Sequence, residues 1–140
     1  RLLFELTESA AVEDMAEAAN FLSQLRSMGH PVCLDDFGAG AAAYSYLRRF
    51  DVDFVKIDGP FLKAASDRGR ERALIRSICV LCQQISCNVI GEMIEDERAA
   101  SLAASLGVGY GQGWLFGKPV PELPWPVRSI RRKGGVETWQ

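Results

Sequence analysis

The sequence lacks several features that mark common classes of protein. No apolar run approaches the roughly 20 residues that a helix needs to cross a bilayer, and no signal-peptide pattern opens the chain. No G-x-G-x-x-G or Walker pattern is present, so nothing in the sequence indicates a dinucleotide or P-loop site. The net charge of -2 over 140 residues argues against broad affinity for a nucleic-acid backbone. We therefore expect a soluble, cytoplasmic protein with no nucleic-acid partner.

Residues that bind soft metals are also few. The one histidine, His30, precedes Pro31 in an expected turn and is interpreted as a loop residue. Among the four cysteines, Cys79 and Cys82 have C-x-x-C spacing, but they lie in an amphipathic helical pattern without a second ligand pair. We interpret them as small buried residues rather than as a redox or metal site.

The rest of the chain has the composition of one globular domain, with 48% hydrophobic and 24% charged residues. Short strand patterns alternate with helical patterns along it. Strands are expected at 2–6, 32–34, 54–57 and 88–91, with a fifth strand or turn reaching Gln112, and helices at 12–28, 41–49, 73–85 and 97–106. This order predicts parallel strands joined by right-handed crossovers. No regular structure is expected in the proline-rich stretch after Pro119.

Charged and polar residues follow the apolar part of each expected strand, namely Glu5, Asp35, Asp36, Lys56, Asp58, Glu92 and Gln112. In a (β/α) barrel the carboxyl ends of all strands open on one face, so these residues would converge. An open doubly wound sheet is the alternative, but it would centre on one switch point with a glycine-rich phosphate loop. The expected fold class is α/β, a partial TIM-like (β/α) barrel with about five of the eight βα units of a full barrel. An N-terminal remainder of the barrel is expected to precede the chain.

The paired aspartates set a condition on the second strand. Neighbouring residues of a strand point to opposite faces, so Asp35 and Asp36 can serve one site only if the strand is ending there. Four carboxylates on one rim, with Glu5 and Glu92 included, would repel one another without a cation, and hard oxygen ligands favour Mg²⁺, Mn²⁺ or Ca²⁺. Two such ions could clamp a phosphodiester, and Lys56 could hold the attacking water or the phosphate.

Two other interpretations of these residues stay open. Acids at strand ends can merely cap the helices that follow, where anions are favourable. A metal-dependent barrel enzyme of the enolase kind would also place acids around Mg²⁺, with a lysine that removes a proton next to a carboxylate.

Five collinear motifs resemble the EAL-type cyclic di-GMP phosphodiesterase domain of bacteria. They read E-L-T-E-S at 5–9, D-D-F-G-A-G at 35–40, V-D-F-V-K-I-D at 52–58, G-E-M-I-E at 91–95 and G-Q-G-W-L-F-G-K-P at 111–119. The resemblance covers residues 1 to about 120, so residues 1–120 are expected to be the C-terminal portion of such a barrel and residues 121–140 a C-terminal extension. It implies cleavage of cyclic di-GMP to linear pGpG with Mg²⁺ or Mn²⁺, while Ca²⁺ inhibits turnover or supports binding only.

The resemblance also implies a role for each matching residue. The metal ligands would be Glu5, Asp35, Asp36 and Glu92, and the catalytic residues Lys56 and Glu92. The supporting shell would comprise Glu8, which pins the loop after the aspartates, with Asp58, Glu95 and Gln112. The last motif contributes the expected ligand-binding residues Phe116, Lys118 and Pro119, and either Trp114 or Phe116 could stack on a guanine.

Departures from the family pattern limit this prediction. The chain has alanine at 39 and 41–43, where the family usually reads D-D-F-G-T-G-Y-S-S-L. Lost hydroxyl groups there favour an alternative, a catalytically degenerate domain that acts as a cyclic di-GMP receptor or interaction module. The family's Glu-Ala-Leu motif and an asparagine ligand lie N-terminal to these residues, so we expect activity from the full-length domain and not from this chain alone. A homodimer through the domain is a further partner that the resemblance implies.

Overall fold

The computed structural model describes residues 2–7, 14–38, 43–120, 131–133 and 136–138. The strands are β1 (Phe4–Thr7), β2 (Val32–Phe37), β3 (Phe54–Ile57), β4 (Asn88–Gly91), β5 (Tyr110–Gly111), β6 (Arg131–Lys133) and β7 (Val136–Thr138). The helices are α1 (Met15–Ser27), α2 (Ala43–Arg49), α3 (Gly59–Ala64), α4 (Gly69–Gln84) and α5 (Glu97–Leu106). In the described parts of the chain, no helix has the length and apolar character to span a membrane.

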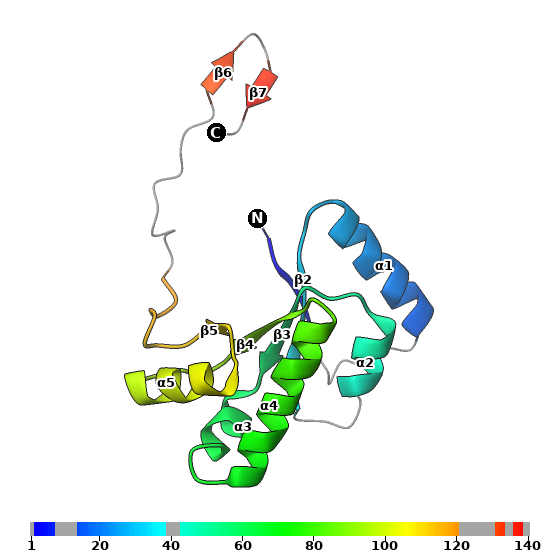
Figure 1. Ribbon diagram of the computed structural model, residues 1–140. Coiled ribbons are helices and arrows are strands. Elements are labelled where there is room, and N and C mark those ends of the chain that lie inside the picture. Colours follow the sequence, from blue (N-terminus) through cyan, green and yellow to red (C-terminus); the bar gives the residue numbers. More distant parts are fainter. Residues whose placement is uncertain (1, 8–13, 39–42, 121–130, 134–135, 139–140) are drawn as a thin grey trace.

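The five strands β1 to β5 form one parallel sheet in the order in which they occur along the chain. Helices lie between successive strands, and Figure 1 shows them gathered along the sheet. This is the expected α/β arrangement of parallel strands and crossovers, one arc of a TIM-like barrel. All carboxyl ends of the strands therefore meet at one edge.

Three features differ from the sequence-based prediction. Helix α3 was not predicted, although Asp58 followed by Gly59 and Pro60 is a helix-start signal, with proline in the first turn. Strand β2 continues through both aspartates to Phe37 instead of ending before them. Strands β6 and β7 form a separate antiparallel pair in the C-terminal extension, where no strand was predicted.

The hydrophobic core lies between the sheet and its helices. Consecutive residues of the central strands are buried on both faces of the sheet, and on the face toward the helices Val32 and Val55 are both at 0% exposure. They pack with Ile75, Ile78 and other buried residues of the helices in one cluster. Because side chains alternate along a strand, the residues between these apolar ones point to the opposite face. That face carries Lys56, the one charged side chain buried among the described residues.

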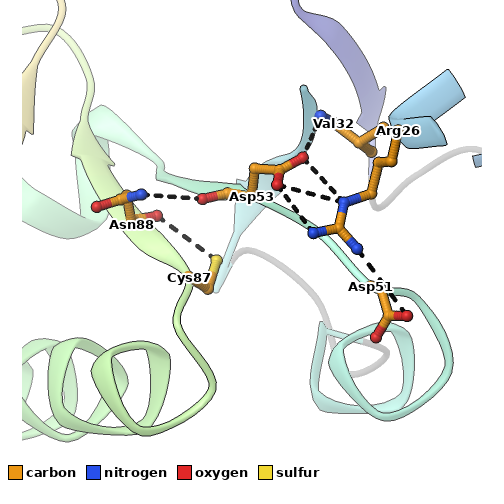
Figure 2. Close-up of polar contacts among 6 residues, drawn as sticks. All are labelled: Arg26, Val32, Asp51, Asp53, Cys87 and Asn88. Carbon is orange, nitrogen blue, oxygen red and sulfur yellow. Dashed lines mark hydrogen bonds and ion pairs between the residues drawn. The ribbon is translucent and has the colours of Figure 1, made fainter. Parts of the chain in front are cut away.

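Asp53 ties the amino-terminal edge of the sheet to α1 (Figure 2). Its carboxylate accepts hydrogen bonds from Arg26 Nε at 3.1 Å, from Arg26 Nη2 at 3.0 Å and from the backbone N–H of Val32 at 2.9 Å. Its backbone carbonyl accepts from the N–H of Asn88 at 2.9 Å. One aspartate therefore links α1 with β2, β3 and β4. Burial alone would raise the pKa of Asp53, but the bonds from Arg26 and Val32 lower it below its ordinary value.

Replacing Asp53 with asparagine is expected to lower the free energy of unfolding by about 2 kcal/mol, since hydrogen bonds to a charged group contribute roughly 1.5–3 kcal/mol. A carboxylate whose pKa is lowered on folding contributes its full stability above the ordinary pKa near 4 and loses it as the pH falls through the lower folded value. Urea unfolding should therefore show a smaller loss of stability below pH 4 in Asp53→Asn than in wild type.

Asp51→Asn is the matched control. Asp51 also faces Arg26, but at 3.9 Å and with its side chain 91% exposed. Equal effects of the two substitutions on the unfolding midpoint would contradict the role given to Asp53.

Candidate metal-binding active site

A bulge in β2 brings the two neighbouring aspartates to one site. The register between β2 and β3 shifts between Leu34 and Phe37, and Asp36 has a φ of +56°. A bulge adds a residue to one strand and redirects the side chains around it. The carboxylate oxygens of Asp35, Asp36 and Glu92 thereby lie within 4.8 Å of one another. Asp35 and Asp36 therefore reach one site because the strand is kinked, and not because it ends there.

Lys56 sits at the centre of the acidic residues. Its Nζ lies 2.7 Å from Glu92 Oε1, 3.0 Å from Asp35 Oδ1 and 3.3 Å from Glu5 Oε2. These partners come from the end of β4, from β2 and from β1, so one ammonium group joins three strands. The lysine side chain is 5% exposed, whereas the three carboxylates are 17%, 16% and 39% exposed. The carboxylates therefore face the surface, and the lysine lies beneath them.

Two groups at this site, Lys56 and Asp58, have shifted pKa values. Burial alone would lower the pKa of Lys56, but its hydrogen bonds to Glu92 and Asp35 and their negative charges raise it above the ordinary value. Lys56 is therefore a cation in the folded protein. Burial and the neighbouring charge of Asp36 raise the pKa of Asp58, which lies at the amino end of α3. Asp58 thus belongs to the same acidic rim.

The donor set fits a hard divalent cation. Asp35, Asp36 and Glu92 can each offer one oxygen within a single 4.8 Å cluster, and all three are half-buried. Oxygen ligands of this kind suit Mg²⁺, Mn²⁺ or Ca²⁺. Glu5 reaches the same group of residues through Lys56. The four expected metal ligands and the expected lysine are therefore close together.

Three of the four expected supporting residues, Asp58, Glu95 and Gln112, lie in the part of the chain that the structure describes. Gln112 lies just after β5, where its N–H donates to the carbonyl of Gly91 at 2.9 Å and its carbonyl accepts from the N–H of Ile94 at 3.0 Å. These bonds hold the segment that follows Glu92, while the Gln112 side chain is exposed. Glu95 is exposed on the same segment. Glu8 and residues 39–42, which include most of the alanine-rich loop, lie outside the described residues.

The last motif presents exposed side chains beyond β5. Trp114 and Phe116 are 62% and 61% exposed, so neither is a core residue. The Nζ of Lys118 lies 4.9 Å from the centre of the Trp114 ring, a cation–π contact. Pro119 is also exposed. These groups can contact a ligand, and their role in binding stays a prediction.

Met93, beside Glu92, departs from the EAL pattern and was not among the predicted site residues. It has a φ of +52°, a conformation that non-glycine residues rarely adopt, and it is 62% exposed. A Cβ on Gly59 would come within 2.6 Å of the Met93 Cβ, so these two residues are in close contact. Methionine at a position where the family usually has glycine was the available signal.

Substituting glycine for Met93 is expected to raise the free energy of unfolding by about 1 kcal/mol, because glycine adopts positive φ without the steric cost of a Cβ. Met93→Ala is the comparison, since it also removes the exposed side chain but keeps the Cβ. Thermal unfolding should rank glycine above alanine. The reverse order would mean that packing of Met93, and not its backbone, sets the stability of this turn.

The described geometry defines a class of protein: a parallel arc of a (β/α) barrel whose strands carry, at their carboxyl ends, a carboxylate cluster suited to a cation and a buried lysine. The sequence model of the EAL domain matches residues 1–119. The chain belongs to the EAL domain family.

Known proteins similar to the chain agree with this assignment. Cyclic di-GMP phosphodiesterase PdeB of Shewanella oneidensis is 36% identical over 84% of this chain and 14% of its own length. An EAL domain protein of Listeria monocytogenes superposes with a TM-score of 0.78 at 31% identity, covering 86% of this chain and 47% of the other. The manganese and cyclic di-GMP complex of Klebsiella pneumoniae BlrP1 has a TM-score of 0.76 at 30% identity, covering 84% and 30%. The chain thus spans less than half of each of these proteins.

Proposed function

We propose that the protein containing this chain hydrolyses one phosphodiester of cyclic di-GMP to give linear pGpG. The observation that carries the proposal is the cluster around Lys56, in which three carboxylates lie within 3.3 Å of one buried ammonium. Two of those carboxylates also belong to the oxygen cluster suited to a divalent cation. The similarity to named cyclic di-GMP phosphodiesterases supports this choice of substrate class.

The chain's own residues would orient the reacting groups. Asp35, Asp36 and Glu92 would hold Mg²⁺ or Mn²⁺, with Glu5 completing the rim. A bound cation of this kind polarises phosphoryl oxygens and lowers the pKa of water. The three carboxylates occupy the three N–H donors of Lys56. A cation that took over one of these carboxylates would free one N–H to donate to an attacking water or a phosphate oxygen from a defined position. Because pGpG keeps a 5′-phosphate, the bond that breaks is the one between phosphorus and the 3′ oxygen.

The exposed aromatic residues after β5 support recognition of the nucleotide. Trp114 or Phe116 would stack on a guanine, and Lys118 would place a positive charge beside the phosphates. Glu95, Gln112, Asp58 and Glu8 are proposed to order the ligands of the cation. For Gln112 the support is its backbone bonding to the segment after Glu92.

The direct test is incubation of the full-length protein with cyclic di-GMP and Mn²⁺, followed by chromatography of the nucleotides. We expect pGpG, with loss of the product in Ca²⁺. Substrate bound but not cleaved, measured by calorimetry in Ca²⁺, would instead support a receptor, the second function favoured by alanine at 39 and 41–43. Absence of both binding and cleavage would reject the proposal.

Partners and location of the full-length protein are part of the same proposal. We place it in the cytoplasm, because all four cysteines of this chain are free, as is usual in reducing compartments. Closure of the barrel would use an N-terminal remainder of the same protein, and dimerisation through the domain would show as a doubled mass in light scattering.

A further inference from the structure

The carboxyl end of α4 places two cysteines against each other. Ser86 has a φ of +59°, its N–H donates to the carbonyl of Gln83 at 3.2 Å, and the N–H of Cys87 donates to the carbonyl of Cys82 at 2.8 Å. These two bonds around a residue of positive φ make the Schellman motif that ends many helices. In that motif the side chains at the positions of Cys82 and Cys87 are usually in apolar contact.

Here both residues at these positions carry thiols. The two side chains lie close enough for a thiol–thiol hydrogen bond to shift both of their pKa values, and the Cys87 thiol donates to the carbonyl of Asn88 at 3.6 Å. A disulfide needs Cα atoms roughly 4.4–6.8 Å apart. The 2.8 Å backbone bond between the same two residues keeps them in that range. The pair is therefore placed for a disulfide by the backbone and not by chance contact of flexible side chains.

Only one of the two thiols can be approached from outside. Cys87 lines a cavity of about 680 Å³ between the end of α4, the start of β4 and the end of α5. The polar residues Arg76, Gln83, Asn88 and Ser105 also line it, as does Cys79, so a small hydrophilic molecule can enter. Cys82 is 0% exposed and lies behind Cys87. This cavity is at the amino-terminal end of β4, and the acidic site is at its carboxyl end.

The hydrogen bond between the thiols gives them different chemistry. Because of its bond with Cys87, and because it is buried, the pKa of Cys82 is raised. The same bond lowers the pKa of Cys87, against the effect of burial. The thiolate is the form that attacks an oxidant. The accessible cysteine is therefore the nucleophile, and the buried one is its partner.

We propose that Cys87 is an oxidation site for small hydroperoxides, with Cys82 as the resolving thiol. The Cys87 sulfur attacks the terminal peroxide oxygen, the O–O bond breaks, and the proton of the thiol goes to the departing alcohol or water, leaving a sulfenic acid. The Cys82 sulfur then attacks the sulfur of that acid, and the hydroxyl leaves as water with the Cys82 proton. Two thiols and one hydroperoxide thus give a disulfide, an alcohol and water.

Cys79 lines the same cavity and is 8% exposed, against 5% for Cys87, but the bond that ends α4 joins Cys82 to Cys87 and not to Cys79. Cys79 packs against the end of α5, where a Cβ on Gly107 would lie 3.3 Å from the Cys79 Cβ. Cys33 is 0% exposed on β2, and its thiol contacts the carbonyl of Leu34. Although Cys79 and Cys82 have the C-x-x-C spacing, the structure pairs Cys82 with Cys87. This proposal is independent of the proposed phosphodiesterase activity.

Peptide mapping tests the pairing directly. The folded protein, free of reductant, is treated with hydrogen peroxide, the remaining thiols are alkylated, and trypsin is added. Cleavage after Arg76 and Arg98 releases one peptide, 77–98, that contains Cys79, Cys82 and Cys87. We expect this peptide to lose two hydrogens and to carry one alkyl group, at Cys79, while Cys33 is fully alkylated. Fragment ions should locate the bond between residues 82 and 87.

Variants separate this pair from the alternatives. Cys79→Ala should form the disulfide as wild type does, whereas Cys82→Ala should accumulate a sulfenic acid at Cys87 that a dimedone probe traps. Far-UV circular dichroism checks that each variant is folded. When wild type is oxidised while unfolded in guanidinium, the preference for the disulfide between Cys82 and Cys87 should be lost. A bond between Cys79 and Cys82, or three alkylated cysteines in the peptide at peroxide doses that oxidise a free thiol, would overturn the proposal.

Discussion

Lys56→Met is expected to bind Mn²⁺ more tightly than wild type and to hydrolyse cyclic di-GMP at least about 100-fold more slowly. The lysine is an internal cation for Glu5, Asp35 and Glu92, so its removal leaves their charges to a metal ion. The same change removes the donor that positions water or phosphate, and a positioned proton-transfer group contributes roughly 10²–10⁴ to a rate. Titration calorimetry measures the first effect and product chromatography the second.

The metal-free form of Lys56→Met should also be less stable, by about 3 kcal/mol, because breaking a buried ion pair leaves uncompensated charge. Added Mn²⁺ should restore much of that loss. Lys63→Met is the control, since Lys63 is an exposed lysine on α3. Loss of Mn²⁺ binding together with activity in a folded Lys56→Met protein would show that the lysine organises the ligands instead of competing for them.

Gly113→Ala is expected to lower the free energy of unfolding by about 3 kcal/mol, the upper end for an overpacked site. A Cβ on Gly113 would overlap backbone atoms of Ile94, which have no rotamer through which to move away. Two hydrogen bonds hold the backbone of Ile94 in place. Its N–H donates to the carbonyl of Gln112, and its carbonyl accepts from the N–H of Leu115 at 3.1 Å. Displacing it would shift the segment that begins with Glu92, so Mn²⁺ affinity should fall as well.

Gly109→Ala provides a control in the same glycine-rich run. The nearest atom to a Cβ on Gly109 is the carbonyl oxygen of Val89 at 3.8 Å, an ordinary contact. Its unfolding midpoint in urea should stay close to that of wild type, while the midpoint of Gly113→Ala falls. Similar unfolding midpoints for the two variants would show that overlap with the Ile94 backbone does not cause the destabilisation.

The fold class and the convergence of charged residues follow from local pattern. The apolar pattern of a strand such as 32–34, or of a helix such as Glu97–Leu106, can be recognised from neighbouring residues alone. Because parallel strands run in a common direction, Glu5, Asp35 and Glu92 then fall at one edge of the sheet. For this reason the four acids and Lys56, far apart in sequence, lie close together in the structure. Resemblance of five motifs suggested the proposed substrate class, which strand-end carboxylates alone do not specify.

Long-range backbone geometry explains what local pattern did not show. The bulge in β2 depends on register with β3, which no feature of D-D-F-G specifies by itself. The close contact between Gly59 and Met93 joins residues on different crossovers. Likewise, the C-x-x-C spacing drew attention to Cys79 and Cys82, whereas the helix end at Ser86 selects Cys87 as the partner of Cys82. In each case the decisive neighbour is set by how a chain segment turns.

The positive φ of Asp36 also limits how the site can change in evolution. Aspartate and asparagine are the residues other than glycine that most readily adopt this conformation, because their short polar side chains can bond to the nearby backbone. Glutamate keeps the negative charge but lacks that conformational preference, so the replacement that looks most conservative chemically is unfavourable for the backbone. Asparagine keeps the backbone and loses the charge. A lineage that abandons metal binding therefore has an easy first step at Asp36, while one that retains it is restricted to a single residue.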